Sequence, residues 1–170
     1  EFAIRMRDRH GMAWVDLNHD QKMDLFITRG GLRGTMKSIP MDFYDELFIS
    51  TPSVMTDIGT FRGLDKDGCP GRQAAWVDYN SDDLLDIYVA CGRERNVGHF
   101  PNKLYRQSPD GNFVDVAAQV GLDIEVDGTF QWMDTDLDGD MDLFWSDEEG
   151  FTLYKNNFGN FVPDQIEVNF

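Results

Sequence analysis

The chain has 170 residues, a length that corresponds to one domain. Hydrophobic residues make up 41% and aromatic residues 13% of it, which excludes a disordered or low-complexity chain. Its 31 acidic residues against 15 basic ones give a net charge of −16, which argues against nucleic acid and anionic lipid as partners. No apolar run reaches the roughly 18 residues that a transmembrane helix needs, so none is predicted.

One sequence pattern recurs along the chain, W-x-D-x-[DN]-x-D-x-x-x-D-[LI]-[FY] followed by an apolar residue. It occupies residues 14–27, 76–89 and 132–145. Three copies with the same tryptophan two residues before the first aspartate indicate an internal repeat. The apolar residues after each aspartate-rich loop are β-branched or aromatic, which favours strands.

Each copy continues with a second apolar segment and then with a turn that precedes a phenylalanine. The segments are 47–49, 104–106 and 153–155, and the turns with their phenylalanines are 59–61, 111–113 and 159–161. Four short strands in about 50–60 residues are typical of a propeller blade. The run from Asp115 to Gly121 could instead form a short helical turn.

The predicted fold class is therefore all-β, a partial β-propeller of three four-stranded antiparallel blades with Ca²⁺-binding loops. The approximate blades are 1–64, 65–122 and 123–170. Propellers typically have about 4–8 blades, so three do not close a ring. We expect a segment of a larger protein, or a ring that blades of other chains complete. The long connection from Arg29 to Glu46 is either a binding loop over one face or an inert surface loop.

The aspartate-rich loops carry the strongest chemical signal. Side-chain oxygens at positions 1, 3, 5 and 9, with a backbone carbonyl at position 7, match the hard-oxygen shell of Ca²⁺. Mg²⁺ needs a compact octahedron and Zn²⁺ needs histidine or cysteine, so neither is favoured. The loop starts like an EF-hand loop but lacks the glutamate at position 12. The predicted ligands are Asp16, Asn18, Asp20, Lys22 (carbonyl) and Asp24; Asp78, Asn80, Asp82, Leu84 (carbonyl) and Asp86; and Asp134, Asp136, Asp138, Asp140 (carbonyl) and Asp142.

The three loops are not expected to bind equally. Position 6 needs a left-handed backbone, which glycine adopts freely; it is Gly139 in loop three, Asp83 in loop two and Gln21 in loop one. Loop three also has four side-chain carboxylates. We therefore predict up to three Ca²⁺ ions, bound most tightly at Asp134–Asp142 and most weakly in loop one. The alternative is aspartate-rich turns that bind no metal.

The two cysteines, Cys69 and Cys91, bracket the second loop hairpin. They could form a disulfide in an oxidising compartment or be two small buried hydrophobic residues. Neither belongs to a C-x-x-C motif, which argues against a redox or zinc role.

The three loops resemble those of VCBS/FG-GAP repeats, the Ca²⁺-binding blades of integrin-α-like β-propellers. Residues 71–89, 102–106 and 110–122 are similar to the repeats found with ASPIC/UnbV domains. The resemblance implies Ca²⁺ in the loop between the first two strands of each blade. It also implies an extracytoplasmic setting (secreted, periplasmic, cell-surface or an organelle lumen) and a role in binding or adhesion.

These features favour a non-catalytic Ca²⁺-binding propeller module that recognises a protein or a glycan, or that acts as a scaffold. No Ser/His/Asp or Cys/His spacing suggests a nucleophile, so no catalytic residue is predicted. Two alternatives remain: a structural subunit of a large extracytoplasmic assembly, and a Ca²⁺-dependent hydrolase or lyase on a propeller scaffold.

Overall fold

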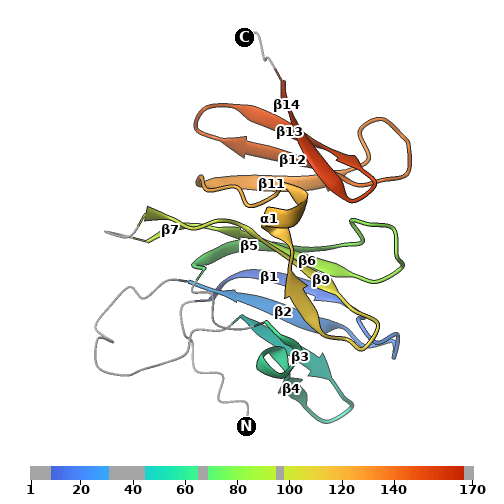
Figure 1. Cartoon of the computed structure of the whole chain (residues 1–170). Helices are drawn as coiled ribbons and strands as arrows, with labels where there is room; N and C mark the ends of the chain where they lie inside the picture. The colour runs from blue at the N-terminus through green and yellow to red at the C-terminus, as the bar shows by residue number, and fades with distance from the viewer. Residues whose placement is uncertain (1–8, 31–44, 65–68, 95–97, 167–170) are drawn as a thin grey trace.

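The structure, a computed structural model, describes residues 9–30, 45–64, 69–94 and 98–166, so residues 31–44 of the long connection lie outside the described part. Three four-stranded antiparallel sheets stack in chain order (Figure 1). This arrangement confirms the prediction of an all-β chain built from three four-stranded antiparallel units.

Each sheet begins at one edge and runs outward strand by strand in chain order. The first sheet contains β1 (Arg9–Val15), β2 (Asp24–Arg29), β3 (Glu46–Ser50) and β4 (Met55–Asp57). The second contains β5 (Gly71–Val77), β6 (Asp86–Cys91), β9 (Lys103–Gln107) and β10 (Phe113–Asp115), and the third contains β11 (Gly128–Met133), β12 (Asp142–Asp147), β13 (Phe151–Asn157) and β14 (Asn160–Ile166). A small hairpin of β7 (Arg93–Glu94) and β8 (Gly98–His99) lies between β6 and β9.

Two hydrophobic cores hold the stack together, one between each pair of neighbouring sheets. Successive side chains of a strand point to opposite faces, so β6 serves both cores. Ile87 and Val89 pack toward the first sheet, whereas Tyr88 and Ala90 pack toward the third. All six residues of β6 are buried, as expected for the central strand of a central sheet.

The turn predicted at Gly59–Phe61 is wrong. Phe61 lies in a 3₁₀ helix, η1 (Gly59–Arg62), and is 83% exposed. Asp57 Oδ1 accepts hydrogen bonds from the backbone N–H groups of Gly59 and of Leu47 in β3. Asp115 Oδ1 accepts the equivalent two bonds, from the N–H groups of Ala117 and of Leu104 in β9. The strand that corresponds to β10 is therefore β4. A helical turn therefore follows the fourth strand in both of these sheets.

The run from Asp115 to Gly121 forms this helical turn in the second sheet, as α1 (Ala117–Val120). Both helical turns end at a glycine with a left-handed backbone, Gly63 with φ 86° and Gly121 with φ 87°. The sequence signal is a shared pattern, D-[IV]-x-x-x-x-G-L, in residues 57–64 and 115–122. The leucine that ends it is buried in both copies.

Cys69 and Cys91 are joined by a disulfide, with their Cα atoms 5.6 Å apart. The bond connects the segment before β5 to the end of β6, in the core between the first and second sheets. The neighbouring backbone hydrogen bond from Gly92 N–H to Pro70 C=O, at 2.8 Å, fixes the same two chain segments.

Candidate metal centres

The three aspartate-rich loops join the first two strands of each sheet and lie on the same side of the stack, at the right in Figure 1. Each loop begins after an edge strand and enters a buried central strand at its last aspartate. A hydrogen bond of 3.1 Å from Ser81 Oγ to Asp140 Oδ1 links loops two and three.

The first aspartate of each loop organises the turn. Asp16 Oδ1 accepts a hydrogen bond from Asp20 N–H at 3.0 Å, and its Oδ2 accepts one from Gln21 N–H at 2.8 Å. Asp78 and Asp134 accept the same two hydrogen bonds in their loops, at 3.0–3.2 Å. These bonds hold the chain in the tight curl that brings positions 1, 3 and 5 together.

The backbone at position 6 is left-handed in all three loops, which confirms that prediction; φ is 66° at Gln21, 65° at Asp83 and 99° at Gly139. Position 4 is also left-handed, which the sequence analysis did not predict; its residues are His19, Ser81 and Leu137. Left-handed backbone at a non-glycine residue is uncommon and costs free energy, and loop three has one such residue where the others have two.

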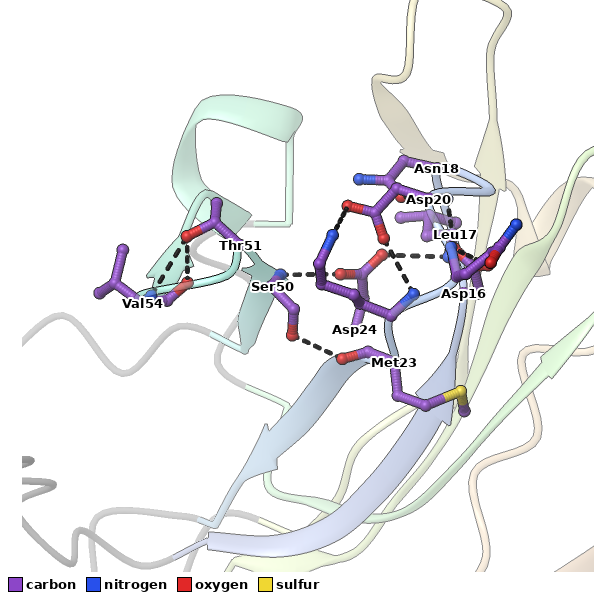
Figure 2. A network of polar contacts seen from close by, with 11 residues as sticks. Asp16, Leu17, Asn18, Asp20, Met23, Asp24, Ser50, Thr51 and Val54 are labelled. Atoms are coloured by element: carbon purple, nitrogen blue, oxygen red, sulfur yellow. Dashed lines mark hydrogen bonds and ion pairs between the residues drawn. The ribbon is translucent and has the colours of Figure 1, made fainter.

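The aspartate at position 9 has a structural role that the sequence analysis missed. Asp24 is fully buried; its Oδ1 accepts a hydrogen bond from Ser50 N–H at 2.8 Å and its Oδ2 accepts one from Leu17 N–H at 3.0 Å (Figure 2). Asp142 does the same with the N–H groups of Asn156 and Thr135. This carboxylate therefore ties the loop to the third strand of its own sheet.

Loop two differs at this position. Asp86 is fully buried and its Oδ1 accepts a hydrogen bond from Gln107 N–H at 2.7 Å. The backbone N–H of Tyr79, the counterpart of Leu17 N–H in loop one, also lowers the pKa of this carboxyl, but Oδ2 has no hydrogen bond of normal geometry within the described chain. The buried Oδ1 of Asn80 is also without a partner there. Burial raises the pKa of Asp86 to about 7, and the charges of Asp82 and Asp78 act in the same direction. Unsatisfied oxygens beside negative charge are a fitting environment for a cation.

Loop three has a carboxylate at position 3, where the other two loops have asparagine. Asp134, Asp136 and Asp138 each offer an oxygen, and these atoms lie within 4.8 Å of one another. They form the one such group of acidic, histidine or cysteine side chains found in the described residues. An ammonium group also reaches this loop, since Lys155 Nζ lies 2.8 Å from Asp136 Oδ2 and lowers the pKa of that carboxyl.

Loop one has its own internal counterion. Lys22, whose carbonyl is the predicted ligand at position 7, places its Nζ 3.0 Å from Asp20 Oδ2 and lowers the pKa of Asp20. Lys22 and Asp20 are two residues apart, so their contact is local in the sequence. Lys155 is 19 residues from Asp136, and its contact with loop three depends on how β13 pairs with β12. Both pairs are exposed and weak, so a divalent ion could displace the lysine.

The donors in all three loops suit a hard cation. Each loop supplies carboxylate oxygens at positions 1, 5 and 9 and a carboxylate or amide oxygen at position 3, and the described loops contribute no sulfur ligand. Convergent carboxylates in loop three and orphaned buried oxygens in loop two make these loops the better fits. Loop one shows neither feature within the described residues, which makes it the poorer fit.

Residues 78–145 match the family model of the FG-GAP-like repeat. The FG-GAP-like match starts at the first aspartate of loop two, crosses the rest of the second sheet and all of loop three, and ends in β12. A search of curated proteins gives no match. Within the described residues, no helix has the length and apolar character needed to cross a membrane.

Proposed function

We propose that the chain is a segment of a Ca²⁺-binding β-propeller, in which the ions are structural and the module recognises a protein or a glycan, or acts as a scaffold, without catalysis. The observation that carries the proposal is the recurrence of one oxygen-lined loop at the same place in three stacked sheets. The FG-GAP-like match over two of these loops supports it.

The proposed role of Ca²⁺ follows from the electrostatics of the loops. Three acidic oxygens within 4.8 Å in loop three repel one another when no cation is bound. A bound ion reverses this repulsion and fixes the loop between two strands, so its binding free energy adds to the free energy of unfolding. A separate ion in loop two would contact Asn80 Oδ1 and Asp86 Oδ2.

The proposed setting is extracytoplasmic. The Cys69–Cys91 disulfide supports this, because such bonds persist mainly in oxidising compartments. The excess of acidic residues argues against nucleic acid as the partner. Since 12 of the 31 acids lie in the three loops, it does not choose between a protein and a glycan.

Thermal unfolding with Ca²⁺ and with EGTA tests the metal proposal. One site at a free Ca²⁺ concentration of 100 times its Kd adds about 2.7 kcal/mol, which corresponds to a Tm increase of about 5–10 °C for a chain of this size. Mg²⁺ at the same concentration should give a smaller increase. An unchanged Tm in Ca²⁺ would contradict the proposal.

Two substitutions test the order of the sites. Asp138→Ala should remove more of the Ca²⁺-dependent Tm increase than Asp20→Ala, because loop three has three convergent carboxylates. A lysine contacts one carboxylate in each of these loops, so the lysines do not decide the order. Glu149→Ala, which removes an exposed acid outside the loops, is the control for the change in net charge. The opposite order would refute the ranking.

Recognition is tested separately, by binding of the Ca²⁺-loaded chain to a glycan array and to candidate extracytoplasmic proteins, with EGTA as the control. Turnover of a bound polysaccharide would instead favour the enzyme alternative. Binding without turnover is the expected result.

A further inference from the structure

The first interface, between the first and second sheets, and the second interface, between the second and third, share a tryptophan contact. Trp76 of the second sheet packs on Phe26 of the first, with ring centroids 6.2 Å apart and planes at 71°. Trp132 of the third sheet packs on Tyr88 of the second, at 5.6 Å and 83°. Trp76 Nε1 also donates a hydrogen bond to the carbonyl of Ala13, at 3.2 Å. On the side of the aspartate-rich loops, however, the two interfaces are filled differently.

In the second interface, a tyrosine ring fills this place. Tyr79, the residue after the first aspartate of loop two, is 3% exposed and belongs to the same hydrophobic cluster as Leu104 and Val116. Its ring centroid lies 6.2 Å from that of Phe161 in β14. Burial raises the pKa of the Tyr79 hydroxyl, and Arg106 of β9 opposes that rise through its charge and a hydrogen bond. The ring is thus packed among apolar side chains, with its hydroxyl beside a guanidinium.

In the first interface, the same place is a cavity of about 430 Å³. Its walls include Leu17, Leu47 and Ile58, which are the counterparts of the tyrosine, leucine and valine that cluster in the second interface. Figure 2 shows one part of the lining, with Leu17 and Asn18 in loop one and Thr51 after β3. Leucine in place of tyrosine leaves the room that the ring takes up in the other interface. The volume is within the range of about 300–1,000 Å³ that is typical of small-ligand sites.

An arginine is present in both places, but it comes from different elements. Arg106 corresponds to Ile49 in the first sheet, since each pairs with the equivalent residue of its fourth strand. In the first interface Arg62 of η1 lines the cavity instead, and its Nη1 donates a hydrogen bond to the carbonyl of Asp110 at 2.9 Å. The guanidinium also lies against Gly111, where an added Cβ would be 3.1 Å from Nη1. These contacts hold a cation beside a mostly apolar cavity.

We propose that this cavity binds an aromatic side chain of a partner polypeptide, tyrosine in preference to phenylalanine. The occupant follows from the second interface, where the ring of Tyr79 takes the corresponding place, and from Arg62, whose guanidinium can donate to a phenol hydroxyl or lie on the face of a ring. A sugar fits less well, because its hydroxyl groups would lose water against an apolar wall. The inference rests on the recognition role in the proposed function and names its partner class, but it does not depend on Ca²⁺.

Titration of the full 170-residue chain with p-cresol, which is the tyrosine side chain alone, tests the cavity. Amide NMR signals of Leu17, Thr56 and Gly111, which all line it, should shift with a Kd on the order of 1 mM, as expected for a single ring. The peptide acetyl-Gly-Tyr-Gly-amide should give the same shifts and bind about threefold more tightly than acetyl-Gly-Phe-Gly-amide, for one added hydrogen bond. Arg62→Met should remove that preference.

Leu17→Tyr gives the first interface the ring that the second interface already has. It should fill the cavity, abolish the shifts and keep the Tm at or above that of wild type. Val162→Tyr, which adds the same ring at a position of β14 that is 59% exposed, is the matched control and should leave binding unchanged. If Leu17→Tyr lowers the Tm, Thr56→Phe, which fills the cavity from β4, replaces it.

The reverse exchange tests the comparison on which the occupant depends. Tyr79→Leu should open an equivalent cavity in the second interface and lower the Tm, and p-cresol should restore part of the loss by binding there. A lowered Tm that p-cresol leaves unchanged would contradict the correspondence between the two places.

Three outcomes would overturn the proposal: no shift with p-cresol, shifts that the cavity-filling variant leaves unchanged, or binding of p-cresol without binding of the tyrosine peptide. The tests also stay separate from those of the metal sites. Peptide binding that Leu17→Tyr abolishes, in a chain whose Tm does not respond to Ca²⁺, would refute only the metal sites. A Ca²⁺-dependent Tm, or glycan binding, in a chain that binds neither p-cresol nor peptide would refute only the aromatic site.

Discussion

Between the first and second sheets, the edge strands β1 and β5 approach each other at two small residues, Gly11 and Ala74. A Cβ atom built on Gly11 would lie 3.0 Å from the backbone of Gln73 and Ala74. Between the second and third sheets, the counterparts of these two residues are large: Gln73 stands in place of Gly11, and Phe130 in place of Ala74. There the side chain of Gln73 bridges to the neighbouring strand, accepting from Phe130 N–H at 3.3 Å and donating to Phe130 C=O at 3.1 Å.

This difference shows that equivalent residues of the repeat point to the same face of their sheets, whereas the distance between the facing edge strands depends on the size of the residues there. Small residues facing small residues allow backbones to meet, whereas a large aromatic residue separates them and a long amide fills the space. The tryptophan contact survives in both cases, although Trp132 Nε1 lacks the acceptor that Trp76 Nε1 finds. Substitutions in the two interfaces should therefore differ in size in ways that can be measured.

The largest expected effect is that of Tyr88→Ala in the second interface. The ring is fully buried, and it packs edge-to-face on Phe130 at 4.8 Å and on Trp132 at 5.6 Å. Removing it should lower the free energy of unfolding by about 3–5 kcal/mol. Urea denaturation measures the loss.

Phe26→Ala is the matched variant in the first interface. It should cost about 1 kcal/mol less than Tyr88→Ala, because Phe26 has one edge-to-face contact and no hydroxyl. Tyr88→Phe isolates the hydroxyl, which accepts a hydrogen bond from Asn102 Nδ2 at 2.9 Å. Equal losses for Tyr88→Ala and Phe26→Ala would show that the two interfaces are energetically alike.

The next largest loss of stability is expected on removal of the disulfide, which lies in the core between the first and second sheets. The double variant Cys69→Ala/Cys91→Ala should lower the free energy of unfolding by about 3 kcal/mol, for a closed loop with a sequence separation of 22. Reduction of the wild-type chain should give a loss of similar size. Hydrogen exchange should show that protection decreases more at β5 and β6 than at β13 and β14.

The sequence predicted the three sheets and their loops because the repeat places identical residues at identical offsets. It did not predict the end of the first sheet, because the phenylalanine of unit one, Phe61, is not the counterpart of Phe113. The residues that do correspond are Asp57 and Asp115, whose carboxylates cap the following helical turn. Aligning the D-[IV]-x-x-x-x-G-L pattern would have placed β4 correctly.

The candidate metal centres were predicted as lists of ligands, and the structure adds what surrounds them. The tie between Asp24 and Ser50 depends on pairing across 26 residues, which no local pattern encodes. The same is true of Lys155 beside Asp136. By contrast, the left-handed backbone at Gln21, Asp83 and Gly139 follows from the loop motif itself.

Gly11→Ala tests the close approach in the first interface. The added Cβ meets two backbone atoms and Thr28 Oγ1 at 3.0 Å, so β1 and β5 have to move apart. Overpacking of this kind should cost about 2 kcal/mol. The equivalent position in the third sheet is Thr129, and Thr129→Ala should cost only about 0.5 kcal/mol, for one exposed hydrogen bond. A Gly11→Ala variant as stable as wild type would disprove that this contact limits the sheet spacing.

The last comparison tests whether the side-chain amide of Gln73 bridges β5 and β11 or merely lies beside β11. Gln73→Ala removes the contacts to Phe130 N–H and C=O and leaves both backbone groups without that partner at a part-buried position. The expected loss is about 1 kcal/mol, because water can replace some of the hydrogen bonding. Gln73→Glu keeps the length and the acceptor but loses the donor, so it should place a negative charge beside the Phe130 carbonyl and be at least as destabilising as Gln73→Ala. If Gln73→Glu were instead as stable as wild type, the separation of β5 and β11 would have to be set by the packing of Phe130 and Trp132 alone.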